Sequence, residues 1–426
     1  MMDIRPIGQS QRNLGGIDYF LLWAGVAISL AEIWAGGFLA PMGLSAGLWA
    51  IILGHLIGNT LMGLGGIIGS DYGIMSMVSV RPSFGLRGAD LAAVLNIIQL
   101  IGWAAIMLII GGHAGAMLGA SAGGLLASDR FWIITIGMGT LLWALYTGKS
   151  VWKILQNTAV VALLLILVVM TWVSFQSFGD RLKWPAGGDL PFMIGLDLVI
   201  AMPISWLPLV ADYSRFSRKT GPAFWNTWWG YFLISSWMYA LGLTATLVTG
   251  NAAPEILVLQ IMGQVGLAIP ALVLVVFSTI TSDFPDIYSA TCSMMNISRK
   301  VGAKSFMWIA GVLSIGVALI FPADQFENFL LFIGAMFVPL FGVVLTDYFL
   351  VRKRRLHVEG LYEVGGAYWY IKGFNPVALG AWAAGFLVFE FIAVMKYPVG
   401  GSLPAMGVAG ALYFFLTRTR KQGEPL

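Results

Sequence analysis

Long apolar stretches separated by short polar segments run along almost the whole sequence. A bilayer core takes about 20 apolar residues per helix, and on that basis the pattern predicts twelve spans. They are 17–43, 47–70, 89–119, 131–147, 153–176, 190–211, 226–250, 264–297, 305–321, 327–350, 375–395 and 400–417. The pattern therefore predicts an all-α polytopic membrane protein with twelve transmembrane helices.

Composition and charge agree with that prediction. Hydrophobic residues make up 58% of the 426 residues and charged ones only 10%, whereas soluble domains carry about a quarter charged residues. With the N-terminus inside, 20 of the 24 Lys and Arg residues fall in cytoplasmic segments, as the positive-inside rule requires. We therefore expect a multi-pass inner-membrane protein with both termini cytoplasmic. The basic residues are scattered in short loops, so no nucleic-acid surface is expected.

The spans divide into two units of five, which must have opposite orientations because five is odd. The expected organisation is a tail (1–16), a first repeat (17–178), a second repeat (190–351), helices 11 and 12 (375–417) and a C-terminal tail (418–426).

Spans 1 and 6 occupy corresponding positions in the two units. Span 1 carries Gly36, Gly37 and Pro41, and span 6 carries Pro203 and Pro208. Such interruptions free backbone groups inside the membrane and predict a transporter site where the two broken helices meet.

Carboxylates lie at membrane depth without a Lys or Arg nearby in any span: Glu32, Asp197, Asp283, Asp286 and Glu390. Each must be protonated, bind a cation or hydrogen-bond a polar ligand. The alternative is an acid bonded to neighbouring backbone, which weighs most for Asp197 and Glu390. His55, alone in span 2, is either a proton relay or a hydrogen-bonded structural residue.

Two local patterns predict ligand chemistry. Ser278, Thr281 and Ser282 share one helix face, where a carbonyl and two hydroxyls could bind a small hard cation, unless they only bond back to their own helix. Gln99 and Trp103 are spaced i and i+4. The indole offers a surface for a flat heterocycle and the amide offers paired hydrogen bonds to its edge, with helix packing as the alternative.

Several segments in this order resemble the nucleobase–cation symporter-1 family over essentially the whole chain. They are the segment around Trp34 to Gly37, the loop Arg81 to Arg87, the Gln99 to Trp103 pair and the element Ala211 to Phe216. Leu30 to Gly37 is most similar to the hydroxymethylpyrimidine permease branch, which supplies a thiamine precursor.

This resemblance implies a leucine-transporter-like 5+5 inverted repeat, alternating access and sodium coupling. The sodium ligands would be carbonyls near Gly25 and Ile28, the Ser278 carbonyl, and the hydroxyls of Thr281 and Ser282. The substrate site would use Gln99 and Trp103, with contributions from the span 1 and span 6 breaks: Glu32, Trp34, Met202, Pro203, Ser205, Trp206, and from span 8 Asp283.

Two positions depart from the related cytosine carriers, which carry Asn at the place of Asp283 and a small polar residue at that of Glu32. A protonated acid accepts from an exocyclic amine and donates to a ring nitrogen, so we expect these residues to favour 4-aminopyrimidines. The same acids would allow proton coupling in place of sodium.

The predicted function is sodium-coupled import of 4-amino-5-hydroxymethyl-2-methylpyrimidine, without an organic cofactor. Cytosine, another nucleobase or a hydantoin is the alternative substrate, and amino-acid or amine transport uses the same fold. A membrane sensor or enzyme is disfavoured because the spans carry no catalytic His, Cys and Ser set and the chain has no soluble output domain.

Overall fold

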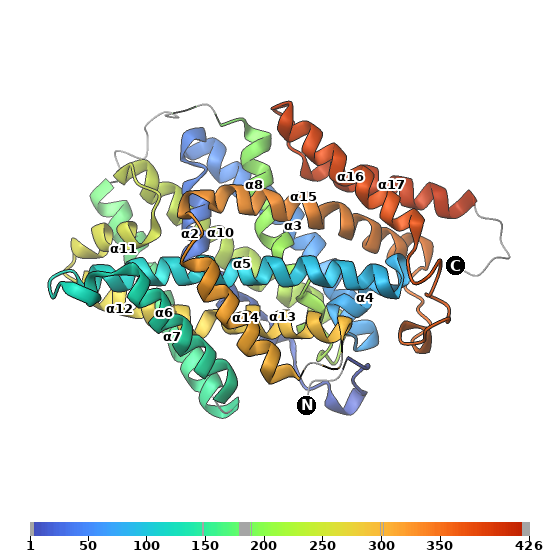
Figure 1. The fold of residues 1–426 in the computed structure, drawn as a ribbon. Coiled ribbons are helices and arrows are strands. Elements are labelled where there is room, and N and C mark those ends of the chain that lie inside the picture. The colour runs from blue at the N-terminus through green and yellow to red at the C-terminus, as the bar shows by residue number, and fades with distance from the viewer. Residues whose placement is uncertain are drawn as a thin grey trace.

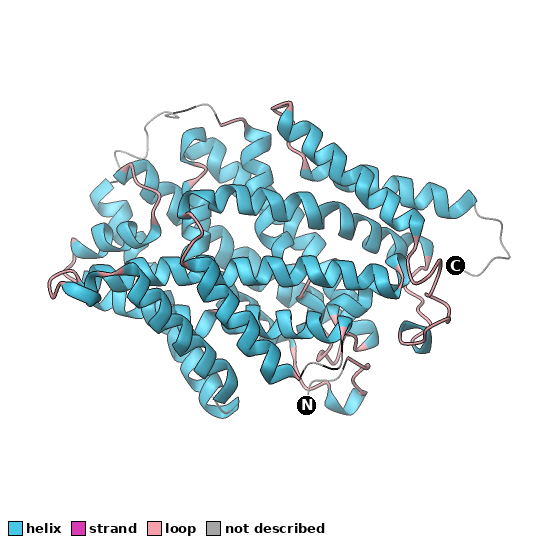
Figure 2. Ribbon diagram, in the orientation of Figure 1, coloured by secondary structure: helices cyan, strands magenta, loops and turns pink. Residues whose placement is uncertain are grey.

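The computed structural model of the protein describes residues 4–146, 149–178, 188, 190–298, 300 and 302–419. Over these residues the regular structure is helical (Figure 2), and every predicted span contains a helix. The first six spans correspond to α1 (Gly16–Ala27) with α2 (Leu30–Gly37), α3 (Leu44–Tyr72), α5 (Leu86–Gly119), α6 (Asp129–Tyr146), α7 (Lys149–Phe178), and α8 (Phe192–Trp206) with α9 (Val210–Ser214). The others correspond to α10 (Thr220–Thr249), α12 (Ala268–Ser282) with α13 (Phe284–Ile297), α14 (Ala303–Ala318), α15 (Phe326–Leu345), α16 (Pro376–Val394) and α17 (Ser402–Thr419).

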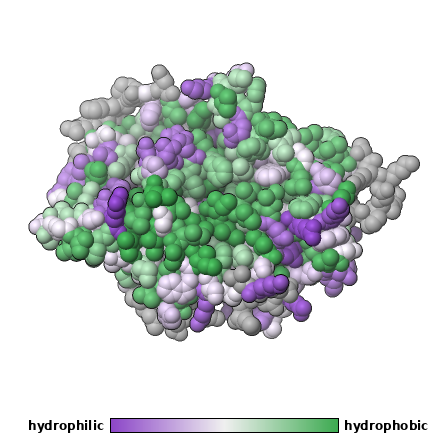
Figure 3. Space-filling view, viewed as in Figure 1, coloured by the Kyte–Doolittle hydropathy of each residue, from purple (hydrophilic) through white to green (hydrophobic). Residues whose placement is uncertain are grey.

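The lengths and hydropathy of the helices fit a membrane protein. Among the described residues six helices are long and apolar enough to cross a bilayer, and the bent pair α1–α2 forms a seventh candidate. Further spans are shorter apolar helices, such as α8 and α14. Hydrophobic residues fill the middle of the face in Figure 3, with hydrophilic residues mainly around its margins. That distribution suits a protein whose sides face lipid and whose ends face water.

Three spans are interrupted, which frees backbone groups inside the helix bundle. The axis bends by 58° between α1 and the segment that starts with α2. Span 6 is broken between α8 and α9, beside Pro208, and span 8 is broken at Asp283, directly before α13. The predicted breaks in spans 1 and 6 are present, and the break in span 8 was not predicted.

The break in span 1 lies at Ile28 and Ser29, not at the glycine pair that the sequence suggested. Gly36 and Gly37 are helical and face α10: a Cβ on Gly36 would overlap the backbone of Tyr239. These glycines therefore allow close packing of α2 on α10 instead of breaking the helix. Ser29 marks the real break as the N-cap of α2, because its hydroxyl accepts a hydrogen bond from the Ala31 amide at 3.2 Å.

Two short helices connect the spans and were not predicted. α4 (Ser76–Phe84) includes part of the segment that the sequence suggested to be a loop, and Gly85, with φ of 88°, separates it from α5. α11 (Pro254–Gly263) lies between α10 and α12. Both have ten residues or fewer, too short to be recognised from a membrane-length apolar pattern.

The packing brings the interrupted spans together in the interior of the bundle. α2 packs against α10, which also packs against α3, while α5 lies along α12 and α13. In Figure 1, α5 and α15 run across the molecule, and the α16–α17 pair lies at its edge beside α15.

Both ends of the described chain lie on one side of the bundle. Near the N-terminus, the Ile4 carbonyl accepts from the Tyr362 hydroxyl in the segment that follows α15. Near the C-terminus, Tyr413 on α17 donates to Asp347 at the end of span 10. This arrangement agrees with an even number of membrane crossings.

Candidate functional site

Aromatic residues from the second half of α2, from α5 and from the start of α15 form a cluster. The ring of Phe326 lies 4.9 Å from Trp34, 5.7 Å from Phe38 and 5.7 Å from Trp103, measured between centroids. Phe329 lies 5.5 Å from Trp103 on a second side. The indole nitrogen of Trp103 is buried and has no hydrogen-bond partner. The predicted residues Trp34 and Trp103 are thus brought together, with an indole donor still available to a ligand.

Gln99 joins α5 to the broken end of α8. Its amide nitrogen donates to the Ser205 carbonyl at 2.7 Å and to Asn96 Oδ1 at 3.0 Å. Its amide oxygen is buried without a partner. Because a buried carbonyl oxygen without a hydrogen bond is costly, this oxygen is a second group available to a ligand, one helix turn from Trp103.

The carboxyl groups of Asp283 and Asp286 are also buried and carry oxygens without a hydrogen-bond partner. Both oxygens of Asp283 and Oδ1 of Asp286 lack a partner. The two side chains are 1% and 5% exposed. Two acids in this state at a helix break are costly unless they are protonated or meet a ligand.

Two contacts fix the register between α5 and span 8. Asn96 donates to Ser293 at 2.8 Å near one end, and Thr279 packs against Gly111 near the other. The helices are therefore antiparallel, and seven residues along each from the first contact lead to Trp103 and Asp286. Trp103 is about level with Asp286, and Asp283 lies one helix turn further along. Gln99 lies one helix turn from Trp103 in the opposite direction, so the buried polar atoms without partners extend over about two helix turns, about 10 Å, along α5 and span 8.

The other predicted residues of span 6 have different surroundings. Met202 is buried, and its carbonyl accepts from the Ser205 hydroxyl at 2.6 Å. Pro203 faces Gly58 on α3. Trp206 donates through its indole nitrogen to the Tyr231 hydroxyl at 2.8 Å. Of this group, Ser205 alone is linked directly to Gln99.

Glu32 points towards α10 and α3. One carboxyl oxygen bonds the Tyr231 hydroxyl at 2.5 Å and the other the Ser235 hydroxyl at 2.6 Å. Ser235 in turn lies 2.5 Å from Nε2 of His55. The sequence analysis singled out Glu32 and His55 but missed Tyr231 and Ser235. Tyr231 and Ser235 are spaced i and i+4, so they lie on one face of α10, and this spacing was the signal that could have identified them.

The predicted cation site maps to the breaks of spans 1 and 8. Gly25 lies in the last turn of α1 and Ile28 is its C-cap, positions whose carbonyls lack partners within the helix. Ile28 and Ser278 line one cavity of about 30 Å³, which is large enough for a water molecule or a small ion. The backbone of Thr281 and Ser282 belongs to α12, but their side chains lie outside the described residues.

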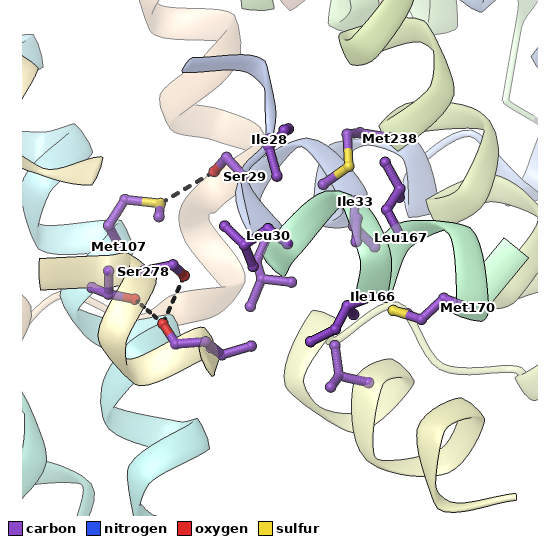
Figure 4. A pocket seen from close by; sticks show the side chains of 14 residues that line it. Ile28, Ser29, Leu30, Ile33, Met107, Ile166, Leu167, Met170, Met238 and Ser278 are labelled. Atoms are coloured by element: carbon purple, nitrogen blue, oxygen red, sulfur yellow. Dashed lines mark hydrogen bonds between the residues drawn. The ribbon is translucent and has the colours of Figure 1, made fainter. Parts of the chain in front are cut away.

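Figure 4 shows how the cavity is built. Ser29, Met107 and Ser278 lie on one side, while Ile166, Leu167 and other apolar residues of α7 and α10 close the other. The Ser278 hydroxyl donates to the Val275 carbonyl at 2.9 Å, which is the bond back to its own helix that the sequence left open. The described oxygens suit a hard cation bound by carbonyls and hydroxyls better than a transition metal. No group of three His, Cys, Asp or Glu residues among the described residues could hold a metal.

Of the remaining membrane acids, Asp197 has a structural role. Its carboxyl group accepts from the backbone amides of Gly401 and Ser402, which attaches α8 to the start of α17. Glu390 is half-buried on α16, at the edge of the bundle. The contacts of Asp197 therefore support the alternative that this acid bonds neighbouring backbone instead of binding a ligand.

The fold and the site together define a multi-pass membrane permease with broken helices around a central binding region. The family model described as a permease for cytosine/purines, uracil, thiamine and allantoin matches residues 6–416. The chain belongs to this family, which is the nucleobase–cation symporter family that the sequence suggested.

Comparison with individual proteins agrees. The chain is 27% identical to the cytosine permease of Escherichia coli K12, over 83% of this chain and 82% of that protein. It is 25% identical to the allantoin permease of Bacillus subtilis, over 91% and 86%. The structure of Mhp1, a nucleobase-cation-symport-1 family transporter in a closed conformation with bromovinylhydantoin bound, superposes with a TM-score of 0.85 and 20% identity, over 97% of this chain and 94% of that one. The relatives are permeases, which agrees with the expectation of a transporter and not an enzyme.

Proposed function

We propose that the protein imports 4-amino-5-hydroxymethyl-2-methylpyrimidine by sodium-coupled symport with alternating access. The carrying observation is the group of buried polar atoms without partners on Gln99, Trp103, Asp283 and Asp286, which lie within about two helix turns of one another beside an aromatic cluster. Unsatisfied buried groups of this kind mark a place where a ligand completes the hydrogen bonding.

The chemistry of these groups matches an aminopyrimidine. The flat ring packs on Trp103 and the phenylalanines of α15, since stacking of a base on an aromatic side chain contributes about 1–3 kcal/mol. The Gln99 amide oxygen, about two helix turns from Asp283, accepts from a different donor of the ligand. A protonated Asp283 donates to a ring nitrogen and accepts from the amine.

Glu32 acts on the substrate site through its neighbours. Its two oxygens already bond Tyr231 and Ser235, and Tyr231 accepts from Trp206, which follows Ser205 at the break of span 6. The selectivity that the sequence assigned to Glu32 is therefore transmitted along this hydrogen-bond chain to the end of α8.

Cytosine is the second candidate substrate. It carries the same amine beside a ring nitrogen, and the cytosine permease of Escherichia coli is among the relatives. The two candidates differ at ring positions 1, 2 and 5, because cytosine has an N1–H, a 2-carbonyl oxygen and no hydroxymethyl group. An apolar contact at position 2 and a hydrogen-bond partner for the hydroxymethyl group therefore separate them.

Sodium coupling is supported by the cavity between the α1–α2 break and α12. The carbonyls of Gly25, Ile28 and Ser278 and the hydroxyls of Thr281 and Ser282 would supply five oxygens, the ligand type that hard cations prefer. Sodium bound here would join α12 to the hinge of span 1. Thr281→Ala should then abolish the sodium dependence of substrate binding.

The test is equilibrium binding to the purified protein, with 4-amino-5-hydroxymethyl-2-methylpyrimidine, cytosine, uracil, a hydantoin and phenylalanine as ligands. We expect the first ligand to bind most tightly and Trp103→Leu to weaken it roughly 5- to 150-fold, the equivalent of about 1–3 kcal/mol. Trp49→Leu is the matched control, because Trp49 is 58% exposed on the outer surface of α3. The proposal would be contradicted if phenylalanine bound more tightly than the aminopyrimidine. It would also be contradicted if each ligand bound Trp103→Leu as tightly as the unchanged protein.

A further inference from the structure

A buried hydrogen-bond chain runs from α8 through α10 and α2 to α3. It consists of Trp206, Tyr231, Glu32, Ser235 and His55, joined by distances of 2.8, 2.5, 2.6 and 2.5 Å in that order. Glu32 is 2% exposed and Ser235 and His55 are fully buried. Water therefore cannot supply missing donors or acceptors, and the protons along the chain can be counted.

The protons at the two ends of the hydrogen-bond chain can be assigned first, because each end has only one possible donor. An indole nitrogen only donates, so Tyr231 accepts from Trp206 and gives its own proton to Glu32. At the other end, Nδ1 of His55 faces the Ile51 carbonyl at 2.9 Å. A carbonyl only accepts, so Nδ1 carries a proton.

Ser235 stands between two acceptors with a single hydroxyl proton. If it donates to Nε2 of a neutral His55, its oxygen must accept from Glu32, which is then a protonated acid. If it donates to an ionised Glu32, Nε2 of His55 must carry a proton, which makes His55 an imidazolium. An ionised Glu32 with a neutral His55 would leave one of the two contacts, at 2.5 or 2.6 Å, without any proton.

We propose that Glu32, Ser235 and His55 form a site that binds one proton, and that this proton holds α2 against α10 and α3. Binding transfers one proton from solvent to the Glu32–His55 pair, and no covalent bond between heavy atoms changes. Without this proton, the Ser235 hydroxyl can donate to only one of its two neighbours, Glu32 and His55. Its oxygen then faces an unprotonated acceptor atom of the other neighbour, and the repulsion favours separation of these helices. The site is distinct from the cavity proposed for sodium.

The neighbouring helices offer few other charges to the site. The phenol groups of Tyr231 and Tyr239 on α10 face it, and the Tyr239 ring lies 5.1 Å from that of His55. Asp197 on α8 is bonded to the start of α17. His113 on α5 pairs with Glu255 of α11 at 3.3 Å.

Charges at the remote ends of the packed helices are paired elsewhere. Asp18 on α1 accepts from the Gly15 amide at 2.8 Å, and Asp71 at the end of α3 pairs with Arg354 at 2.8 Å. Among the described residues, Glu32 and His55 are therefore the groups in a position to share the proton of this site.

The geometry connects proton binding to the parts that move in a permease. α2 begins at the break of span 1 and carries Trp34 of the aromatic cluster, and close packing of Gly36 on α10 resists any change in their separation. Trp206, at the far end of the chain, directly follows Ser205, the partner of Gln99. The coupling of this proton to transport rests on the proposed function, whereas the existence of the site does not.

The test is spectroscopic and needs no substrate. Infrared difference spectra across a pH titration report the protonated carboxyl of Glu32, and nitrogen-15 spectra of labelled histidine report whether His55 is neutral or an imidazolium. Glu32→Gln is the informative variant, because its amide oxygen accepts from Tyr231 and its NH2 group donates to Ser235, which mimics the protonated acid. His55→Gln assigns the signal of His55 among the three histidines.

We expect one of two results near neutral pH: a carboxyl band that Glu32→Gln removes, with His55 neutral, or a His55 imidazolium with Glu32 ionised. In either case Ser235→Ala should shift the titration midpoint, and Asp283→Asn, a second buried acid, should leave it in place. An ionised Glu32 together with a neutral His55 would overturn the proposal. Failure to transport any pyrimidine would contradict the proposed function and leave this spectroscopic result unaffected.

Discussion

Gln99 connects the substrate site to the stability of the break in span 6, and its replacement by leucine separates this account from simple helix packing. Leucine is similar in size but cannot donate to the Ser205 carbonyl or to Asn96, whose bonds measure 2.7 and 3.0 Å. Each of these two buried acceptors would lose its donor, at a cost of about 1–3 kcal/mol. The free energy of unfolding should fall by about 2–6 kcal/mol in total, less any relief from removing the unpaired Gln99 oxygen.

The assay combines thermal unfolding of the purified protein with ligand binding at a temperature where both variants are folded. We expect a lower melting temperature for Gln99→Leu, and aminopyrimidine binding weakened roughly 5- to 150-fold by the loss of one hydrogen bond worth about 1–3 kcal/mol. Gln260→Leu is the control, because Gln260 is exposed on α11. If Gln99→Leu matches Gln260→Leu in both stability and affinity, the reasoning about the orphaned acceptors is wrong.

Four further substitutions test other parts of the structure. Asp283→Leu removes both the donor and the acceptor that a protonated Asp283 offers, so it should weaken aminopyrimidine binding in competition assays; unchanged affinity would exclude Asp283 from recognition. Arg352→Ala removes the partner of buried Asp347, 2.7 Å away, and should cost about 3–5 kcal/mol of unfolding free energy. The Arg354 side chain is 48% exposed, so Arg354→Ala should lower the unfolding free energy by under about 1 kcal/mol. Equal losses of unfolding free energy in the two arginine variants would contradict the expectation that burial sets the difference. Gly36→Val should force α2 from α10 and lower the melting temperature, and an unchanged value would contradict the close packing.

The membrane class and the presence of a helix in each predicted span could be predicted from the sequence, because a helix in lipid requires a long apolar stretch. The positions of the breaks were harder to predict. The glycine pair at 36 and 37 looked like a hinge but packs against α10, whereas Ser29, with no Gly or Pro beside it, caps α2. A glycine that allows close helix packing and one that breaks a helix look alike in a single sequence.

The candidate site was predicted in part for a similar reason. Gln99 and Trp103 lie on one helix, so the 3.6-residue period was enough to place them together. The link between Glu32 and Ser235 joins residues 203 positions apart. It depends on the rotation of α2 and α10 about their axes, which helical periodicity within each segment does not determine.

Sodium-coupled import is tested by the uptake of labelled 4-amino-5-hydroxymethyl-2-methylpyrimidine into proteoliposomes, with sodium and pH gradients imposed separately. We expect accumulation that is driven by an inward sodium gradient and lost in Thr281→Ala. Accumulation driven by the pH gradient alone would contradict sodium coupling. Absence of uptake under both gradients, with cytosine or an amine transported instead, would contradict the proposed substrate.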